Sequence, residues 1–409
     1  MDKAATVNAP RDTVLQDKLQ AHHALADEFI AVRRDIHQHP EMGYKEYRTS
    51  DLVAEQLSAW GYQVTRGLGG TGVVGQLKKG SGTPSIGIRA DMDALPIEEA
   101  TGLPYASFKV GIMHACGHDG HTAMLLAAAK HIAQQGVFSG TVNLIFQPAE
   151  EGLGGAKKMM EDGLFQQFPC KAIFAMHNMP GQPQGHLVLR DGSAMASSDY
   201  VTITLHGKGG HGAMPHLAAD PVVAGSAIVM GLQSIVARNV DPQHMAIITV
   251  GAFNAGVANN VIPQSATLRL SVRSLDRDVR VLLEKRITEL VHAQAQSYGV
   301  TADIDYQRGY PVLVNHPAET ELARTVAQEL VGSARVVRQG PALTGSEDFA
   351  FMLEEVPGSY VLIGNGQGPG DGHGACMVHN PGYDFNDKNV AIGAAFWSLL
   401  VERFLPVQG

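Results

Sequence analysis

Hydrophobic residues recur every three or four positions over residues 17–60, and this spacing predicts a helix that ends at Gly61. Compact apolar runs at residues 86–90, 142–146 and 172–176 predict three buried strands. Helical patterns lie between the first two runs and after the second. Strands that alternate with helices favour a largely parallel or mixed sheet covered on both faces. The first part of the chain is therefore expected to form an α/β domain.

A strict alternation of apolar and polar residues begins near residue 200 and marks a change of architecture. The pattern predicts a strand, a helix, two strands, a helix and a strand, at residues 200–206, 220–240, 246–251, 266–273, 277–298 and 302–306. This order is the split βαβ arrangement of ferredoxin-like domains. Later segments predict a helix, a strand and a helix that return to the first domain, at residues 319–331, 359–363 and 389–404. We therefore expect an α/β domain, residues 1–194 and 309–409, interrupted by an inserted α+β domain, residues 195–308.

Composition and charge restrict the class of partner. The 409 residues are 44% hydrophobic and 17% charged, which is typical of a folded protein. A formal net charge of −9 gives no general electrostatic reason to bind nucleic acid or an anionic membrane, so a small-molecule partner is expected. The polar N-terminal stretch lacks the apolar core of a signal peptide, and no apolar run approaches the roughly 18 residues of a membrane span.

The three cysteines, Cys116, Cys170 and Cys376, are too scattered for a disulfide framework. This usage fits a reducing compartment and, with the lack of a signal-peptide pattern, predicts a cytoplasmic protein. Cys116 lies among His114, His118 and His121, and thiolate and imidazole together suit zinc-like divalent ions. The alternative is that Cys116 is a small buried hydrophobe and that the histidines cap a helix.

Acidic residues and a histidine follow the predicted strands of the first domain. Asp91 and Asp93 follow the first strand, Glu150 and Glu151 the second, and His177 the third. Ligands of open α/β sheets bind beyond the carboxyl ends of the strands, so these groups can meet in one crevice. Paired carboxylates after an apolar run call for a nearby cation, although a solvated loop is the alternative. Asp93 is expected to orient a histidine, whereas Asp91 could simply cap its strand.

Taken together, five side chains could give two divalent ions protein ligands with open positions for water and substrate: Cys116, His118, Glu151, His177 and His379.

The sequence resembles peptidase family M20 and, within it, the amidohydrolase branch of hippurate hydrolases, N-acyl-amino-acid hydrolases and auxin-conjugate hydrolases. The resemblance covers nearly the whole chain through motifs at residues 33–41, 89–96, 113–121 and 147–152 and around His379. It implies a mixed-sheet dinuclear metallohydrolase domain with an inserted lid and dimerisation domain. By the same resemblance, the metal ligands are Cys116, His118, Glu151, His177 and His379, and the general base is Glu150.

The resemblance also implies roles for residues of the inserted domain. His211 is expected to reach a tetrahedral oxyanion, in the active site of a partner subunit, which implies a homodimer or higher homo-oligomer. Asn260 and Arg273 are expected to hold the carboxylate of the released amino acid, with Arg269 and Arg238 as competitors of Arg273.

The expected activity is metal-dependent cleavage of an N-acyl-amino acid into a carboxylic acid and an amino acid, with two Zn²⁺, Mn²⁺, Co²⁺ or Ni²⁺ ions per subunit. A dipeptidase or carboxypeptidase of the same superfamily is the nearest alternative. A mechanism with Cys116 as nucleophile and His118 or His121 as its base leaves Glu150 and the remaining ligands unused. The remotest alternative is a scaffold that binds a small ligand without turnover.

Overall fold

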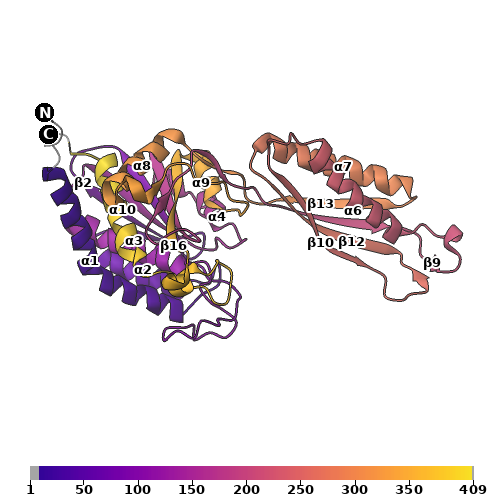
Figure 1. Cartoon of the computed structure of the whole chain (residues 1–409), viewed down its shortest axis with the longest axis horizontal. Helices are drawn as coiled ribbons and strands as arrows, with labels where there is room; N and C mark the ends of the chain where they lie inside the picture. The colour runs from indigo at the N-terminus through magenta and orange to yellow at the C-terminus, as the bar shows by residue number, and fades with distance from the viewer. Residues whose placement is uncertain (1–8, 408–409) are drawn as a thin grey trace, which may run out of the picture. The chain divides into compact units, whose positions relative to one another are not determined.

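The computed structural model describes residues 9–407, with side chains from His22 onward except those of residues 369, 371 and 373. Residues 1–8, which begin the polar N-terminal stretch, lie outside the described residues. The chain forms two units (Figure 1). Unit 1 comprises Met1–Gly192, Asn315–Pro341 and Phe351–Gly409, and unit 2 comprises Ser193–Val314 and Ala342–Ala350.

The inserted domain expected at residues 195–308 lies wholly within unit 2. Residues 193–194 and 309–314, which the sequence pattern assigns to the first domain, belong to unit 2. The same pattern assigns residues 342–350 to the first domain, but the structure places them in unit 2. The reason is backbone hydrogen bonding: the Ala196 N–H donates to the carbonyl oxygens of Leu343, at 3.0 Å, and Gly345, at 2.9 Å.

Unit 1 is built on one mixed sheet of strand order β1-β2-β4-β3-β5-β16-β6-β15. The four central strands, β4, β3, β5 and β16, are parallel to one another. At one side of them β2 pairs antiparallel with β4, and β1 pairs antiparallel with β2. The mixed α/β sheet expected from the sequence is confirmed. The strands are β1 Gln63–Leu68, β2 Gly72–Lys79, β3 Ser85–Asp91, β4 Gly140–Gln147, β5 Ala172–Pro180, β6 Leu187–Val188, β15 Val336–Val337 and β16 Gly358–Gly366.

The central helix of unit 1 is α3, His118–Gln134, whose residues from His118 to Ala129 are all buried. It packs against the sheet strands β3, β4 and β5 and against helices α1 and α10. The other helices outside the inserted domain are α1 Ala9–Gln38, α2 Tyr47–Ala59, α4 Gly155–Glu161, α5 Leu164–Gln167, α8 Pro317–Val331, α9 Phe349–Glu355 and α10 Asn389–Phe404, with short 3-10 helices at Ser333–Arg335 and Pro369–Ala375. A further 3-10 helix, Pro215–Leu217, lies in unit 2.

The single helix predicted over residues 17–60 is wrong, because the chain forms two helices, α1 and α2, with a turn between them. Pro40 follows the end of α1, and the residue before a proline disfavours the helical conformation. Tyr44 then adopts a left-handed conformation with φ of 61°. The apolar spacing continues across this turn because both helices bury residues against the same core.

Unit 2 contains a four-stranded antiparallel sheet of order β10-β12-β8-β13. Its element order agrees with the expected β-α-β-β-α-β unit: β8 Asp199–His206, α6 Pro221–Arg238, β10 Ala246–Ala255, β12 Ser265–Ser274, α7 Arg277–Ser297 and β13 Thr301–Arg308. Two small ribbons accompany it, β9 Gly210–His211 with β11 Val261–Ile262, and β7 Gly192–Met195 with β14 Leu313–Asn315.

Helix α6 has membrane-spanning length although it contains no unbroken apolar run of about 18 residues, so the expectation from apolar runs did not detect it. By length and composition, its 18 residues with a mean hydropathy of 1.4 would suffice to cross a membrane. One face of α6, which includes Ala224, Ile228, Leu232 and Ile235, is buried in the core of unit 2. That burial at helical spacing is the behaviour of a core helix.

Candidate metal centre

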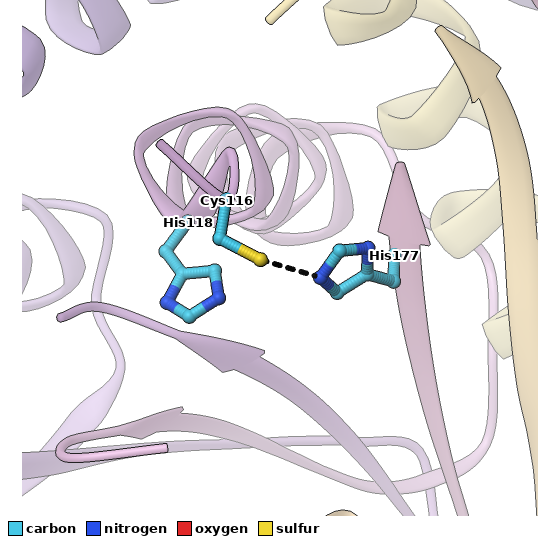
Figure 2. A group of neighbouring side chains, drawn as sticks. All are labelled: Cys116, His118 and His177. Carbon is cyan, nitrogen blue, oxygen red and sulfur yellow. Dashed lines mark hydrogen bonds between the residues drawn. The ribbon is translucent and has the colours of Figure 1, made fainter. Parts of the chain in front are cut away.

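The candidate ligands of unit 1 come from four segments around the carboxyl ends of its parallel strands. Cys116 and His118 lie at the start of α3, and His177 lies in β5. Glu151 follows β4, and His379 lies in the segment before α10. Figure 2 shows Cys116 and His118 beside the start of α3, with the Cys116 Sγ directed at His177 Nε2, 3.3 Å away. Segments more than 250 residues apart thus meet at one place.

The ligand atoms form two groups that share the thiol of Cys116. Cys116, His118 and His177 present ligand atoms that lie within 4.8 Å of one another, and so do Cys116, Glu151 and His379. A sulfur common to both groups suits two neighbouring cations. The structure therefore brings together all five predicted ligands, which we call the metal centre; their role as ligands stays a prediction.

A glycine is required between the two α3 ligands. Gly117 has a φ of 89°, in the left-handed region that L side chains rarely adopt. A Cβ at Gly117 would lie 2.3 Å from Asn178 Nδ2 and 2.4 Å from the Tyr383 hydroxyl. The tight turn lets Cys116 and His118 face the same space.

Hydrogen bonds fix which nitrogen each buried imidazole presents. His118 Nδ1 lies 3.2 Å from Asp93 Oδ1, and His177 Nδ1 lies 2.6 Å from the Asn178 carbonyl oxygen. With Nδ1–H donating in each ring, Nε2 carries the lone pair that a metal needs. Asp93 thus orients a histidine, as expected. Asp91 does more than cap a strand, because its Oδ1 lies 2.6 Å from His121 Nδ1.

The backbone beside the paired carboxylates is anchored by two other acids. The N–H groups of Glu150 and Glu151 donate to the two oxygens of Asp93, at 3.1 and 3.0 Å. Ala149, in a left-handed conformation with φ of 54°, donates its N–H to Glu46 Oε1 at 2.8 Å. Burial raises the pKa of Glu46 to about 7. Glu150 is itself buried, which suits a general base held away from bulk solvent beside the metal centre.

His379 also adopts a left-handed conformation, with φ of 62°. Its N–H donates to the Ala115 carbonyl oxygen at 2.7 Å, and its Nε2 lies 3.2 Å from Glu151 Oε1. A non-glycine residue in this region is strained and persists only where its surroundings hold it. The strain is therefore located at a residue expected to bind a metal.

The electrostatics of the metal centre fit divalent cations. Burial, together with Glu151 and Glu150, raises the pKa of the Cys116 thiol well above its usual range, so its thiolate needs compensating positive charge. Burial lowers the pKa of His177 and keeps that ring neutral. Burial also lowers the pKa of His118, but Asp91 and Asp93 outweigh it and raise the pKa to about 10.

Two buried atoms of the centre support the same conclusion. Among the described residues, His118 Nε2 has no hydrogen-bond partner, and Glu151 Oε1 has none apart from the 3.2 Å approach of His379 Nε2. Buried polar atoms are rarely left unpaired, and a cation satisfies both at once. The residues present therefore fit a metal.

Sequence reasoning missed Glu46 and Asn178. Glu46 holds the backbone at Ala149, and Asn178 Nδ2 donates to the Cys116 carbonyl oxygen at 2.6 Å. Both act on backbone groups of segments distant in the chain, and no residue spacing marks such contacts in a sequence.

Two of the three residues assigned to unit 2 lie together. His211 in β9 pairs with Val261 of β11, and the Gly212 N–H donates to the Asn260 carbonyl oxygen at 2.8 Å. The Ala213 N–H donates to His211 Nδ1 at 3.0 Å, which places the imidazole proton on Nε2. His211 is exposed and can offer that N–H as a donor.

Arg273 lies at the other end of β12. Ser265 pairs with His206 at the end of β8 near β9 and β11, whereas Val272 pairs with Asp199 at the start of β8. Eight residues of strand separate Ser265 from Arg273, about 26 Å at 3.3 Å per residue. One copy of unit 2 therefore cannot hold a single carboxylate with both Asn260 and Arg273. Arg273 Nη1 donates instead to the Thr344 carbonyl oxygen at 3.0 Å.

Comparison with known proteins shows to which protein family this chain is related. The model of peptidase family M20/M25/M40 matches residues 87–403. The chain belongs to this family. The family membership, the fold and a hydrolase activity on amide bonds, all expected from the sequence, are thereby confirmed.

Relatives within the M20 family differ in the substrates that their names state. A hippurate hydrolase of Campylobacter jejuni is 46% identical over 381 residues, 93% of this chain and 97% of the relative. The thermostable carboxypeptidase 1 of Saccharolobus solfataricus is 38% identical, over 93% of this chain and 96% of the relative. The crystal structure of the Bacillus subtilis YXEP protein, a dinuclear metal binding peptidase, matches with a TM-score of 0.81 at 31% identity, over 94% of this chain and 99% of that chain.

Proposed function

We propose that this M20 protein hydrolyses the amide bond of an N-acyl-amino acid and releases a carboxylic acid and a free amino acid. The observation that carries the proposal is the convergence of Cys116, His118, His177, Glu151 and His379 beside the buried Glu150. The 46% identity to a hippurate hydrolase supports an acyl-amino acid, with an aromatic acyl group as the first substrate to test.

The proposed cofactor is a pair of divalent ions per subunit. Cys116, His118 and His177 would hold one, and Cys116, Glu151 and His379 the other. Ions bound there supply Lewis acidity, which polarises an amide carbonyl and lowers the pKa of a water molecule. Glu150 would accept a proton from the attacking water molecule and donate it to the leaving nitrogen. Ligand type does not choose among Zn²⁺, Mn²⁺, Co²⁺ and Ni²⁺.

We propose that two copies of the chain form a dimer through unit 2. The outer face of α6 is apolar and exposed, with Val223 at 50% and Met230 at 73% exposure, and such a face favours self-association. Strand β10 is an edge of its sheet and offers backbone groups for pairing with another copy. In this dimer His211 and Asn260 of one copy would act with Arg273 of the other, because the two ends of β12 lie too far apart for one copy to supply both.

Metal removal and a substrate series test the proposed function. Rigorous chelation should abolish hydrolysis of N-benzoylglycine, and adding back single metals should restore it. Full activity of the metal-free protein would contradict the proposal. The series compares N-benzoyl- and N-acetyl-amino acids with dipeptides that have a free amino terminus. Preference for the dipeptides would favour the second candidate function, a peptidase, which the carboxypeptidase relative suggests.

A cysteine nucleophile and a non-catalytic scaffold both fit the site less well than a metal-dependent hydrolase. A nucleophilic Cys116 needs a lowered pKa, whereas burial raises the pKa of this thiol. A non-catalytic scaffold has no use for the buried Glu150. The cytoplasmic location inferred from cysteine usage stays a prediction.

A further inference from the structure

A buried ionic cluster lies beside the metal centre, and the roles assigned so far do not use it. Its core is Arg33 of α1, a fully buried arginine in the first of the sequence motifs. Its partners are the carboxylates of Asp119, 3.1 Å from Arg33 Nε, of Asp384, and of Asp387, 3.5 Å from Nε. A buried guanidinium with this many acids must compensate charges that the fold brings together.

The acids of this cluster lie in two of the four segments that carry metal-centre residues, the start of α3 and the His379 segment. Asp119 directly follows His118 at the start of α3. Asp384 and Asp387 lie five and eight residues after His379, and Arg33 Nη2 also donates to the Phe385 carbonyl oxygen at 3.0 Å. Arg33 is therefore a direct link between the α3 start and the His379 segment.

Further contacts make the link rigid. The Tyr105 hydroxyl donates to Asp384 Oδ2 at 2.7 Å, and the Tyr105 ring lies 5.0 Å from the Arg33 guanidinium carbon. His37, one turn along α1, places Nδ1 2.8 Å from Asp119 Oδ2 and Nε2 3.3 Å from Glu99 Oε2. Arg33 thus holds the His379 segment through planar, multiple contacts that a lysine cannot reproduce.

The two groups of the metal centre depend unequally on this link. Cys116, His118 and His177 stand on α3 and β5 in the core of unit 1, and Asn178 and Asp93 hold them independently. His379 is half-exposed, left-handed, and belongs to no helix or strand. Loss of Arg33 would leave Asp119, Asp384 and Asp387 without their shared guanidinium and displace the loop that carries His379.

We propose that Arg33 is a positioning residue for His379 and selectively supports the ion shared by Cys116, Glu151 and His379. This inference rests on the proposed two-ion centre. Its consequence is that weakening the ionic cluster lowers the affinity for one ion only. The ion at Cys116, His118 and His177 stays tightly bound, and the ion at Cys116, Glu151 and His379 is lost first.

The test is Co²⁺ titration of the metal-free full-length protein, comparing wild type with Arg33→Lys. The matched control is Arg324→Lys, which changes a buried arginine of α8 whose Nη2 lies 2.7 Å from Asp191. Stoichiometry counts the ions, and the sulfur-to-cobalt absorption reports binding at Cys116. Arg33→Lys should keep that absorption and one tight ion, and bind the second about 10- to 100-fold more weakly. The control should bind both ions like the wild type.

Each remaining outcome is decisive. If Arg33→Lys binds the second Co²⁺ ion as tightly as the control does, Arg33 has no positioning role. If Arg33→Lys binds both ions more weakly by the same factor, the role is not selective for one ion. A wild type that binds one ion contradicts the two-ion centre itself, which distinguishes the two failures. If Arg33→Lys does not fold, Asp384→Asn changes the carboxylate to which Arg33 Nη2 donates directly and should weaken binding of the second ion in the same direction; unchanged binding there overturns the proposal.

Discussion

The metal centre of unit 1 and the paired segments around His211 and Asn260 in unit 2 hold their polar side chains in opposite ways. His118 and His177 are locked by hydrogen bonds on the nitrogen that faces away from the centre. His211 also has a hydrogen bond on Nδ1, from the Ala213 N–H, but its side chain is exposed to solvent on a two-residue strand. The metal centre is therefore preorganised by its own chain, whereas the region around His211 becomes enclosed only when it binds a substrate or another copy of the chain.

The greatest loss of activity should come from removing the atom that both ion groups share. Cys116→Ser should lower kcat/KM by more than the roughly 10⁴-fold upper limit expected for a proton-transfer group, because it weakens both ions together. Cys170→Ser, a cysteine outside the centre, is the matched control. Metal content by elemental analysis accompanies the kinetics. A Cys116→Ser protein that kept two ions and wild-type turnover would remove the thiol from the metal centre.

Glu150→Gln should lower kcat by about 10²- to 10⁴-fold and leave metal content unchanged. The amide keeps the shape of the carboxylate but cannot accept the proton of water. Steady-state kinetics and elemental analysis check both parts. Loss of metal together with activity would mean that Glu150 is a metal ligand. This alternative is specific because Glu150 lies close to His118 and Glu151.

His211→Ala should lower kcat by about 10²-fold, the cost of one missing oxyanion donor, without changing the free energy of unfolding, because the side chain is exposed. Mixing it with Glu150→Gln shows whether the exposed histidine of unit 2 serves the metal centre of another copy. If His211 acts in a partner's site, mixed dimers contain one intact site and activity returns. Absence of recovery despite demonstrated subunit exchange would place His211 in the site of its own chain.

A more modest effect concerns the pH dependence of stability. Burial lowers the pKa of His37, but the Asp119 carboxylate outweighs it and raises the pKa to about 9. The charged imidazole therefore stabilises the fold fully below pH 6.5, and this contribution is lost as the pH rises through 9, by at most about 1.4 kcal/mol per pH unit. Urea unfolding from pH 6 to 10 should show a larger loss of stability in the wild type than in His37→Gln, which keeps only the contribution of His118, whose pKa is raised to about 10. Parallel stability curves would mean that His37 is neutral in the folded protein.

The sequence predicted the core elements of both units well, because strands such as β3 and β4 are continuous apolar runs and α7 has a clear helical period. It failed at the turn between α1 and α2, where Pro40 and the left-handed Tyr44 interrupt a pattern that both helices share. The metal-centre residues could be nominated because ligand chemistry limits them to Cys, His and Glu. Glu46, Asn178 and the partners of Arg33 could not, since their contacts are set by tertiary packing rather than by spacing.

The proposed chemistry depends on Cys116 standing between two cations. Anomalous diffraction from crystals of the metal-loaded protein, collected at the absorption edge of the added metal, would locate them. We expect two peaks per chain, both within bonding distance of the Cys116 sulfur, one also beside His118 and His177 and the other beside Glu151 and His379. Peaks elsewhere, or a single peak that leaves Glu151 and His379 without a metal, would contradict the two-ion centre.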